Sequence, residues 1–384
     1  MRKIVLGFLI VLAFGLALQF SAKPLFAFAK PTTSKSKKIA EGYCVVERTT
    51  GRVLSGENTE KRLSMASTTK IITCILVIEN CQNLDKIVEI MPEACGIEGS
   101  RLNLKKGEHL SVRELLIGLM VKSGNDAAIA LAIDTFGSIE NYQKAANEFV
   151  EKLGCKNTHI VTPNGLDDKE HYTCALDMAK IACYALSNDT FRQFCCLKEV
   201  EISNEFGKEK RKLVNKNKML KNYEGATGVK TGFTKKSGRC LVSSAKRNGM
   251  ELVCVVLHCD NWFDESAALL DTAFEKFGMV EIVPEHFHFG TVPCLFGDKK
   301  QVNVFCNKGF WYPLKTDEYG KIRKEISLPQ VVKVPTYLGM VLGKICVYFE
   351  NELIFCENIY TMEEVKSMRL GDIFARLWSD IVLT

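Results

Sequence analysis

The chain has 384 residues, of which 47% are hydrophobic and 25% are charged, and its formal net charge is +6. A chain of this length can bury a large core and has room for more than one domain. The weak positive surplus lacks the strongly basic character of a nucleic-acid-binding protein, so we expect no nucleic-acid partner.

Residues 1–29 have the pattern of a signal peptide that is removed on export. Two basic residues precede an apolar run over residues 4–20, and the segment ends in the small residue Ala29. Its removal lowers the formal charge from +6 to +3, because the segment holds three basic residues and no acid. An uncleaved membrane anchor is the alternative, since the apolar run approaches the length that spans a bilayer. In both cases the rest of the chain is exported, beginning with a polar linker over residues 30–39.

Residues 40–278 have the pattern of an α+β domain, with strands at both ends and helices between them. Helical periodicity dominates residues 68–186, and Asn248-Gly249 marks a hairpin turn. The expected strands are residues 42–47, 52–54, 238–245 and 251–258, and a helix over residues 263–277 closes the domain. We therefore expect the strands from both ends to share one sheet.

Beyond Gly278 the pattern changes to short strands separated by turns, which predicts a small all-β domain over residues 279–362. Its expected strands are residues 289–296, 301–306, 330–334, 343–349 and 352–356. This domain holds no catalytic constellation, so we expect it to position the first domain or to bind a partner. In residues 363–384 the apolar side chains recur at helical spacing and predict an amphipathic helix.

The first domain contains the motif Ser67-Thr68-Thr69-Lys70 at the start of a helical pattern. Residues three apart share a helix face, so the Lys70 amine can approach the Ser67 hydroxyl and remove its proton. For this the amine must be neutral, which requires burial or nearby positive charge, such as Lys230, to lower a pKa normally near ~10.4. The backbone N–H of Ser67 can form half of an oxyanion hole.

A second motif, Ser123-Gly124-Asn125, lies between two helical patterns over residues 112–121 and 126–136, which predicts a short rigid loop. Ser123 is placed to pass a proton between Lys70 and a leaving nitrogen. Asn125 is placed to bond a substrate amide or Lys70 itself.

A third motif, Lys230-Thr231-Gly232, heads an expected edge strand. The missing side chain at Gly232 leaves room for a peptide substrate to lie alongside as an added strand. Lys230 and Thr231 offer a cation and a hydroxyl to a carboxylate. The N–H of Phe233 is the candidate for the second oxyanion donor.

Each motif alone is a weak signal, and Ser34-Lys35-Ser36-Lys37 repeats the first one in a polar segment without a helix. In this order, however, the three motifs resemble the active-site signature of penicillin-binding proteins and serine β-lactamases. Their surroundings resemble the low-molecular-mass penicillin-binding proteins that act as D-alanyl-D-alanine carboxypeptidases, peptidase family S11. The segments that carry this resemblance are Thr49-Thr50-Gly51-Arg52-Val53-Leu54, Met65 to Ile71, Ser123 to Ala128, and Thr162-Pro163-Asn164-Gly165-Leu166-Asp167.

The resemblance implies a β-lactamase/transpeptidase-like domain in which an antiparallel sheet and a helical lobe flank the site. It implies a peptidoglycan stem peptide ending in D-Ala-D-Ala as substrate, β-lactam antibiotics as inhibitors, and no cofactor. Ser67 becomes the acylated nucleophile, Lys70 its base and Ser123 the proton relay. The C-terminal helix is then expected to lie on the membrane with Trp378 at the interface, and a helix docked on its own domain is the alternative.

The chain departs from many relatives at Phe233, where they carry histidine. Only the backbone N–H is needed there, so we expect altered substrate preference and not loss of activity. The arginine that some relatives use for the terminal carboxylate has no motif match, although Lys216 and Lys218 lie in that neighbourhood.

The 16 cysteines are scattered without a C-x-x-C pair, so we expect most of them to be buried free thiols. Neither G-x-S-x-G nor H-E-x-x-H occurs, which removes support for a Ser-His-Asp hydrolase and for a zinc peptidase. His286 and His288 would share a strand face but have no third ligand nearby, so no metal is expected.

Two other functions fit the same fold. The commonest class of β-lactamase carries an acidic residue in an E-x-x-L-N loop, and no such pattern occurs between Asn125 and Lys230. The other is a non-catalytic sensor that binds penicillin or the cell wall. Intact Ser67, Lys70 and Lys230 argue against it.

Overall fold

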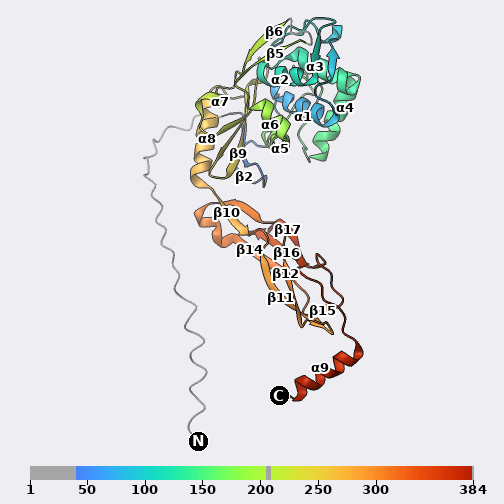
Figure 1. The fold of residues 1–384 in the computed structure, drawn as a ribbon. Helices are drawn as coiled ribbons and strands as arrows, with labels where there is room; N and C mark the ends of the chain where they lie inside the picture. Colours follow the sequence, from blue (N-terminus) through green and yellow to red (C-terminus); the bar gives the residue numbers. More distant parts are fainter. Residues whose placement is uncertain (1–39, 205–208, 383–384) are drawn as a thin grey trace. The chain divides into compact units, whose positions relative to one another are not determined.

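The computed structural model describes residues 40–204 and 209–382. The expected signal peptide and linker lie outside the described residues. Within the described chain, a sheet with helices comes first, followed by a run of strands and the terminal helix α9, Leu370–Val382 (Figure 1).

The first part is built on a five-stranded antiparallel sheet with the strand order β2-β1-β9-β8-β7. Its strands are β1 Gly42–Glu47, β2 Val53–Glu57, β7 Ala226–Thr234, β8 Gly238–Arg247 and β9 Met250–Leu257. Strands from both ends of the domain share this sheet, as expected. The expected turn at Asn248-Gly249 connects β8 to β9, and both residues have a positive φ, which suits an Asn-Gly turn.

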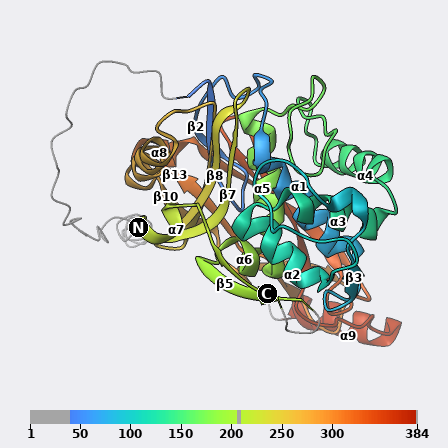
Figure 2. The ribbon, with the colours of Figure 1, turned by 90° about the horizontal axis from the view of Figure 1, so that it is seen from above.

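Every residue of β9 is buried, which is typical of a strand that is covered on both faces. Its side chains alternate between two hydrophobic cores. Val253 and Val255 face the larger core under the helical lobe, while Leu252 and Cys254 face a second core under α8. Figure 2 shows α8 on one side of the sheet and the helices α1 to α6 on the other.

The helices of this part are α1 Lys70–Asn80, α2 Val112–Ile117, α3 Asn125–Phe136, α4 Ile139–Lys152, α5 Ala175–Ala185, α6 Asp189–Cys195, α7 Met219–Asn222 and α8 Trp262–Lys276. Two short ribbons lie at its edge, β3 Ile87–Glu89 with β4 His109–Ser111, and β5 Glu199–Ser203 with β6 Lys210–Val214.

Two expected helices differ in detail from the structure. The segment expected to be helical over residues 112–121 forms α2 only to Ile117 and then widens into a π-helix over Gly118–Lys122. The helix expected from Thr68 begins with a 3-10 turn, Ala66–Thr69, before α1. The 3-10 turn contains Ser67 and the π-helix ends directly before Ser123, and such irregular turns are frequent at functional sites.

The second part contains a six-stranded sheet with the order β14-β16-β17-β12-β11-β15 and a pair β10-β13. Its strands are β10 Gly278–Val283, β11 His288–Leu295, β12 Gln301–Phe305, β13 Phe310–Leu314, β14 Ile322–Ser327, β15 Val332–Lys333, β16 Val341–Phe349 and β17 Glu352–Thr361. The sequence pattern missed β10, β13 and β14. Nearly all of β14 is exposed and its centre, Arg323-Lys324-Glu325, is charged, so the alternation expected of a half-buried strand is missing.

The cysteines follow the expectation of mostly free thiols. Fourteen are free, and nine of these are buried, while Cys346 and Cys356 form a disulfide between the paired strands β16 and β17. In the described part of the chain, no helix has the length and apolar character needed to cross a bilayer.

Candidate active site

Ser67 is held on a tight turn at the entrance to α1. Ala66 before it has a φ of +47°, a conformation that L-residues rarely adopt. The hydroxyls of the two residues after it tie the turn together: Thr68 Oγ1 donates to Met65 O at 2.6 Å and Thr69 Oγ1 to Ala66 O at 2.8 Å. Both threonines are fully buried, so these hydrogen bonds hold the backbone around Ser67 in place from the protein interior.

Lys70, one turn along, brings its amine to the Ser67 hydroxyl. The Lys70 Nζ lies 2.8 Å from Ser67 Oγ, 2.7 Å from Asn125 Oδ1 and 2.6 Å from the carbonyl oxygen of Asn164. The two amide oxygens can only accept hydrogen bonds. They therefore take the two hydrogens of a neutral amine, which leaves its lone pair directed at the Ser67 hydroxyl.

The environment of Lys70 favours this neutral form. Its side chain is completely buried, and this desolvation lowers the pKa of the Lys70 amine well below its usual value. The positive charge of Lys230 lowers this pKa further, as expected from the sequence, while the carboxylate of Asp126 acts in the opposite direction. Burial and the neighbouring Lys216 lower the pKa of Lys230 itself to about 7.

The second motif reaches the site through the end of the π-helix. Ser123 terminates it in the left-handed region, with a φ of +63°, and Asn125 is the first residue of α3. The Asn125 side chain is fixed at both ends, because Nδ2 donates to Glu98 O at 2.6 Å while Oδ1 accepts from Lys70. No group in residues 40–204 or 209–382 forms a hydrogen bond with the Ser123 hydroxyl. Ser123 is therefore linked to the site only by its position two residues before Asn125.

The third motif lies on β7, which is an edge strand as expected. A Cβ added at Gly232 would lie 3.0 Å from both Met65 O and Ser67 N. The Ser67 turn therefore lies directly beside Gly232, and glycine allows this close approach. The expected substrate strand alongside Gly232 stays a prediction. The Lys230 amine donates to Thr231 O at 2.9 Å, and the side chain of Phe233 is 62% exposed.

Two residues of this site, Asn164 and Gly165, were not predicted to take part. Their segment came forward only as part of the family resemblance. Gly165 has a φ of +81°, and an added Cβ would lie 2.0 Å from Ala66 O and 2.9 Å from Thr69 Oγ1. The loop can approach the Ser67 turn and present the Asn164 carbonyl to Lys70 only because residue 165 has no side chain.

His171 also supports the site, although no histidine is near the motifs in sequence. Its Nδ1 accepts from Val161 N–H at 2.9 Å, so the proton is on Nε2, which lies 2.8 Å from Thr69 Oγ1 and donates to it. Burial lowers the pKa of His171 to about 4. The neutral ring thus joins the loop to the first motif across 102 residues of sequence.

Residues 40–204 and 209–382 were also compared with the pattern of a metal site. Among the described residues, no three His, Cys, Asp or Glu side chains are arranged as metal ligands. His288 instead contacts Asn303 Oδ1 at 3.1 Å.

Comparison with known proteins identifies the same enzyme class. The sequence profile of the D-alanyl-D-alanine carboxypeptidase family matches residues 29–261, and that of the penicillin-binding protein 5 C-terminal domain matches residues 277–367. D-alanyl-D-alanine carboxypeptidase DacC of Escherichia coli (strain K12) is 31% identical over 97% of this chain and 95% of its own length. DacF of Bacillus subtilis (strain 168) is 30% identical over 88% of this chain and 90% of its own length.

Solved structures agree with the sequence comparison. Penicillin-binding protein 5 of Haemophilus influenzae superposes with a TM-score of 0.72 at 26% identity, covering 88% of this chain and all of that one. Its fold is the expected one, an antiparallel sheet with a helical lobe followed by an all-β domain. The chain therefore belongs to the D-alanyl-D-alanine carboxypeptidase family of serine peptidases.

Proposed function

We propose that this enzyme removes the terminal D-alanine from peptidoglycan stem peptides through an acyl-enzyme on Ser67. The observation that carries the proposal is the buried Lys70 amine, which two carbonyl-type acceptors orient so that its lone pair faces a hydroxyl 2.8 Å away. A base in this position activates a serine without a histidine.

In the acylation step, the Ser67 hydroxyl proton passes to the Lys70 lone pair while Oγ bonds to the peptide carbonyl carbon. The oxyanion then accepts hydrogen bonds from the backbone N–H groups of Ser67 and Phe233. This assignment is supported by Gly232, which lies beside Ser67 N, so that the next residue of β7, Phe233, follows close to the same turn. The amide C–N bond breaks, and Ser123 passes the proton from Lys70 to the leaving amine. Water then hydrolyses the acyl-enzyme ester, and the same groups transfer protons in the reverse direction.

Lys230 and Thr231 bind the carboxylate of the terminal D-alanine in this proposal, with Asn125 and Phe233 beside the scissile amide. A lysine with a pKa of about 7 is partly neutral in the free enzyme at neutral pH. An arriving carboxylate favours its charged form, so substrate binding and protonation of Lys230 reinforce each other. A β-lactam, whose carboxylate and strained amide occupy the same positions, would acylate the same serine.

One experiment separates this function from the β-lactamase and the non-catalytic sensor. The protein and its Ser67→Ala variant are incubated with a D-Ala-D-Ala peptide and, separately, with labelled penicillin. Release of D-alanine, together with long-lived labelling that the variant lacks, supports the carboxypeptidase. Rapid turnover of penicillin without peptide hydrolysis would indicate a β-lactamase. If the protein showed neither activity, the non-catalytic sensor would be the remaining function.

We further propose that the enzyme works at the outer face of the cell membrane, anchored by residues 363–384. In α9 the side chains of Leu370, Phe374 and Trp378 lie on one face and are more than 70% exposed. Met368 N–H donates to Phe296 O, so this helix begins next to another exposed aromatic residue of the β domain. Exposed apolar side chains of this kind suit the boundary between lipid headgroups and acyl chains.

The membrane proposal is tested by co-sedimentation with anionic vesicles. We expect the chain without residues 1–29 to bind vesicles, and a chain that also ends at Met368 to lose this binding while keeping its peptidase activity. Equal binding by the two proteins would contradict a role for α9.

A further inference from the structure

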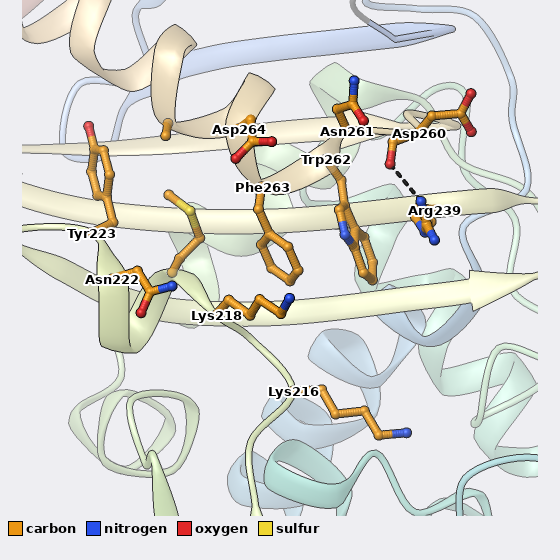
Figure 3. Close-up of a pocket in the computed structure, with 12 residues that line it drawn as sticks. Lys216, Lys218, Asn222, Tyr223, Arg239, Asp260, Asn261, Trp262, Phe263 and Asp264 are labelled. Atoms are coloured by element: carbon orange, nitrogen blue, oxygen red, sulfur yellow. Dashed lines mark hydrogen bonds between the residues drawn. The ribbon is translucent and has the colours of Figure 1, made fainter.

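A surface groove lies apart from the three motifs, on the side of the sheet that α8 covers (Figure 3). Its volume of about 660 Å³ is in the range of sites that bind small molecules. Within the described chain, its lining comes from residues 216–223, from Arg239 of β8 and from residues 260–267, and none of these belongs to a motif. The groove is therefore a candidate for a second binding site, separate from the acyl-transfer site.

Two aromatic side chains form one wall of this groove. The rings of Trp262 and Phe263 lie side by side at the start of α8, with their centroids 4.8 Å apart. Figure 3 shows both rings reaching from α8 over the strands toward Lys218. Because both side chains are only half-buried, part of this apolar surface remains open to a ligand. Such a wall favours a ligand that can stack its own ring on an aromatic one.

Three exposed cations also line the groove: Lys216, Lys218 and Arg239. In residues 40–204 and 209–382, no carboxylate lies within ion-pair distance of any of them. Lys216 Nζ lies 3.4 Å from Ser100 Oγ, which is an uncharged partner. Arg239 donates to the backbone oxygen of Asp260 at 2.8 Å, which is also uncharged. The positive charge here is therefore not neutralised locally and can attract an anion.

Neutral and acidic polar side chains complete the groove. The carboxylates of Asp260 and Asp264 lie on the α8 side in Figure 3, away from the two lysines. The side chains of Asn222 and Asn261 are exposed, and that of Asn261 does not cap α8. An amide side chain offers both donors and an acceptor, so these two residues suit hydroxyl and acetamido groups.

We propose that this groove binds an acidic glycan of N-acetylated amino sugars, namely a cell-wall glycan segment whose muramic acid residues carry free carboxylates. The choice of ligand rests on the proposed function, because peptidoglycan stem peptides are attached to strands of this chemistry. Sugar rings would pack on Trp262 and Phe263, and a carboxylate would meet Lys218. The acetamido and hydroxyl groups would bond to Asn222 and Asn261.

This ligand uses every feature of the groove, whereas simpler ligands use only some of them. A phosphate polymer would pair with the lysines but would leave the aromatic wall and the amides unused. A neutral amino-sugar chain would use the wall and the amides but would leave the lysines without a counter-charge. A bound acidic glycan would hold the enzyme on the wall while the acyl-transfer site stays open, which raises the local concentration of stem peptides there.

Binding of two matched sugars tests this proposal. One is a tetrasaccharide of alternating N-acetylglucosamine and N-acetylmuramic acid with free carboxylates, and the other has these carboxylates reduced to alcohols. Dissociation constants are measured by isothermal titration calorimetry, with and without prior acylation of the enzyme by penicillin. We expect the acidic sugar to bind about fivefold more tightly, the effect of one favourable exposed charge interaction. Acylation should not change this, because the groove is separate from Ser67.

Two variants and a matched control locate the binding. Lys218→Glu should abolish the difference between the two sugars, as should about 1 M NaCl, where the Debye length is ~3 Å. Trp262→Ala should weaken the binding of both sugars by about tenfold, because it removes part of the stacking surface. Lys221→Glu should bind both sugars like the unaltered enzyme, because this exposed lysine of α7 does not line the groove. Unchanged release of D-alanine from a short peptide shows that each variant is folded.

Equal affinity for the acidic and the reduced sugar, or a difference that survives Lys218→Glu, would overturn the proposal. Loss of binding on acylation would also overturn it, because the sugar would then occupy the acyl-transfer site. Binding that Trp262→Ala leaves unchanged would show a simple anion site and not a glycan site. If the unaltered enzyme released no D-alanine, the proposed function would be refuted, whatever the sugars showed.

Discussion

Replacing Gly165 with alanine perturbs the site without touching a reacting group. The added Cβ would lie 2.0 Å from Ala66 O, whereas real Cβ contacts essentially never fall below 3.0 Å. The loop or the Ser67 turn must therefore move by about 1 Å, and either movement changes the distance between Lys70 and its partners. A displacement of this size at a reacting pair costs about 100-fold in rate. We expect the acylation rate by a fluorescent penicillin, measured by stopped flow, to fall by about this factor.

Gly154→Ala provides the control, because Gly154 also has a positive φ, +68°, but an added Cβ meets nothing within 4 Å. Both variants place a side chain in the left-handed region, at about 1 kcal/mol each, so both should lose similar conformational stability from strain. Only Gly165→Ala should lose acylation. If Gly165→Ala acylated within about threefold of Gly154→Ala, the claim that this loop positions the Ser67 turn and Lys70 would be wrong.

Three further predictions concern groups around the site and the thiols. The folded protein holds His171 neutral, with a pKa of about 4 against 6.5 for the free side chain, so its contribution to stability is complete above pH 6.5 and is lost as the pH falls toward 4. Denaturant titrations should show that the free energy of unfolding falls by about 3 kcal/mol over this range, and that His171→Gln lacks this loss. The same pH dependence of stability in both proteins would contradict a buried neutral ring. Asp126→Asn should cost about 2 kcal/mol of stability in urea, because the buried carboxylate accepts from the N–H groups of Leu102, Leu104 and Ala127. The control Asp134→Asn breaks an ion pair with Lys86 at the surface and should lower stability by about 1 kcal/mol or less. Equal losses of stability in the two variants would show that the buried hydrogen bonds of Asp126 contribute no more than this surface pair. Titration of the unfolded chain with a thiol reagent should give 14 reactive groups before reduction and 16 after it, and 16 before reduction would exclude the disulfide.

The local parts of the fold could be predicted from the sequence because their causes are local. An Asn-Gly pair between two apolar runs favours a tight turn that joins two antiparallel strands, and β8 and β9 form the hairpin that this pair predicts. The three motifs carry most of the site for the same reason, since the spacing of Ser67 and Lys70 is fixed by one helical turn. Even the effect of Lys230 on the pKa of Lys70 was accessible, because two lysines at one site must influence each other.

The contacts between distant segments could not be predicted. Nothing in the sequence near Thr69 indicates that His171 binds its hydroxyl, and the Asn164 carbonyl acts through its backbone, which every residue has. The close approach of Gly232 to the Ser67 turn was likewise not predicted, because sequence shows that a side chain is missing but not which neighbour lies beside it. The π-helix over Gly118–Lys122 was likewise hidden by an ordinary helical pattern.

In the proposed mechanism, Lys70 acts on Ser67 as a neutral amine. The neutral state of Lys70 can be measured through the pH dependence of the acylation rate constant. Saturating penicillin is used, because saturation removes the effect of Lys230 on binding. Because the pKa of Lys70 is well below its usual value, the rate should reach its plateau at a pH well below ~10.4 and should fall only at lower pH. A rate that rises about tenfold per pH unit up to about pH 10, as for an ordinary lysine, would show that Lys70 is charged in the folded enzyme at neutral pH.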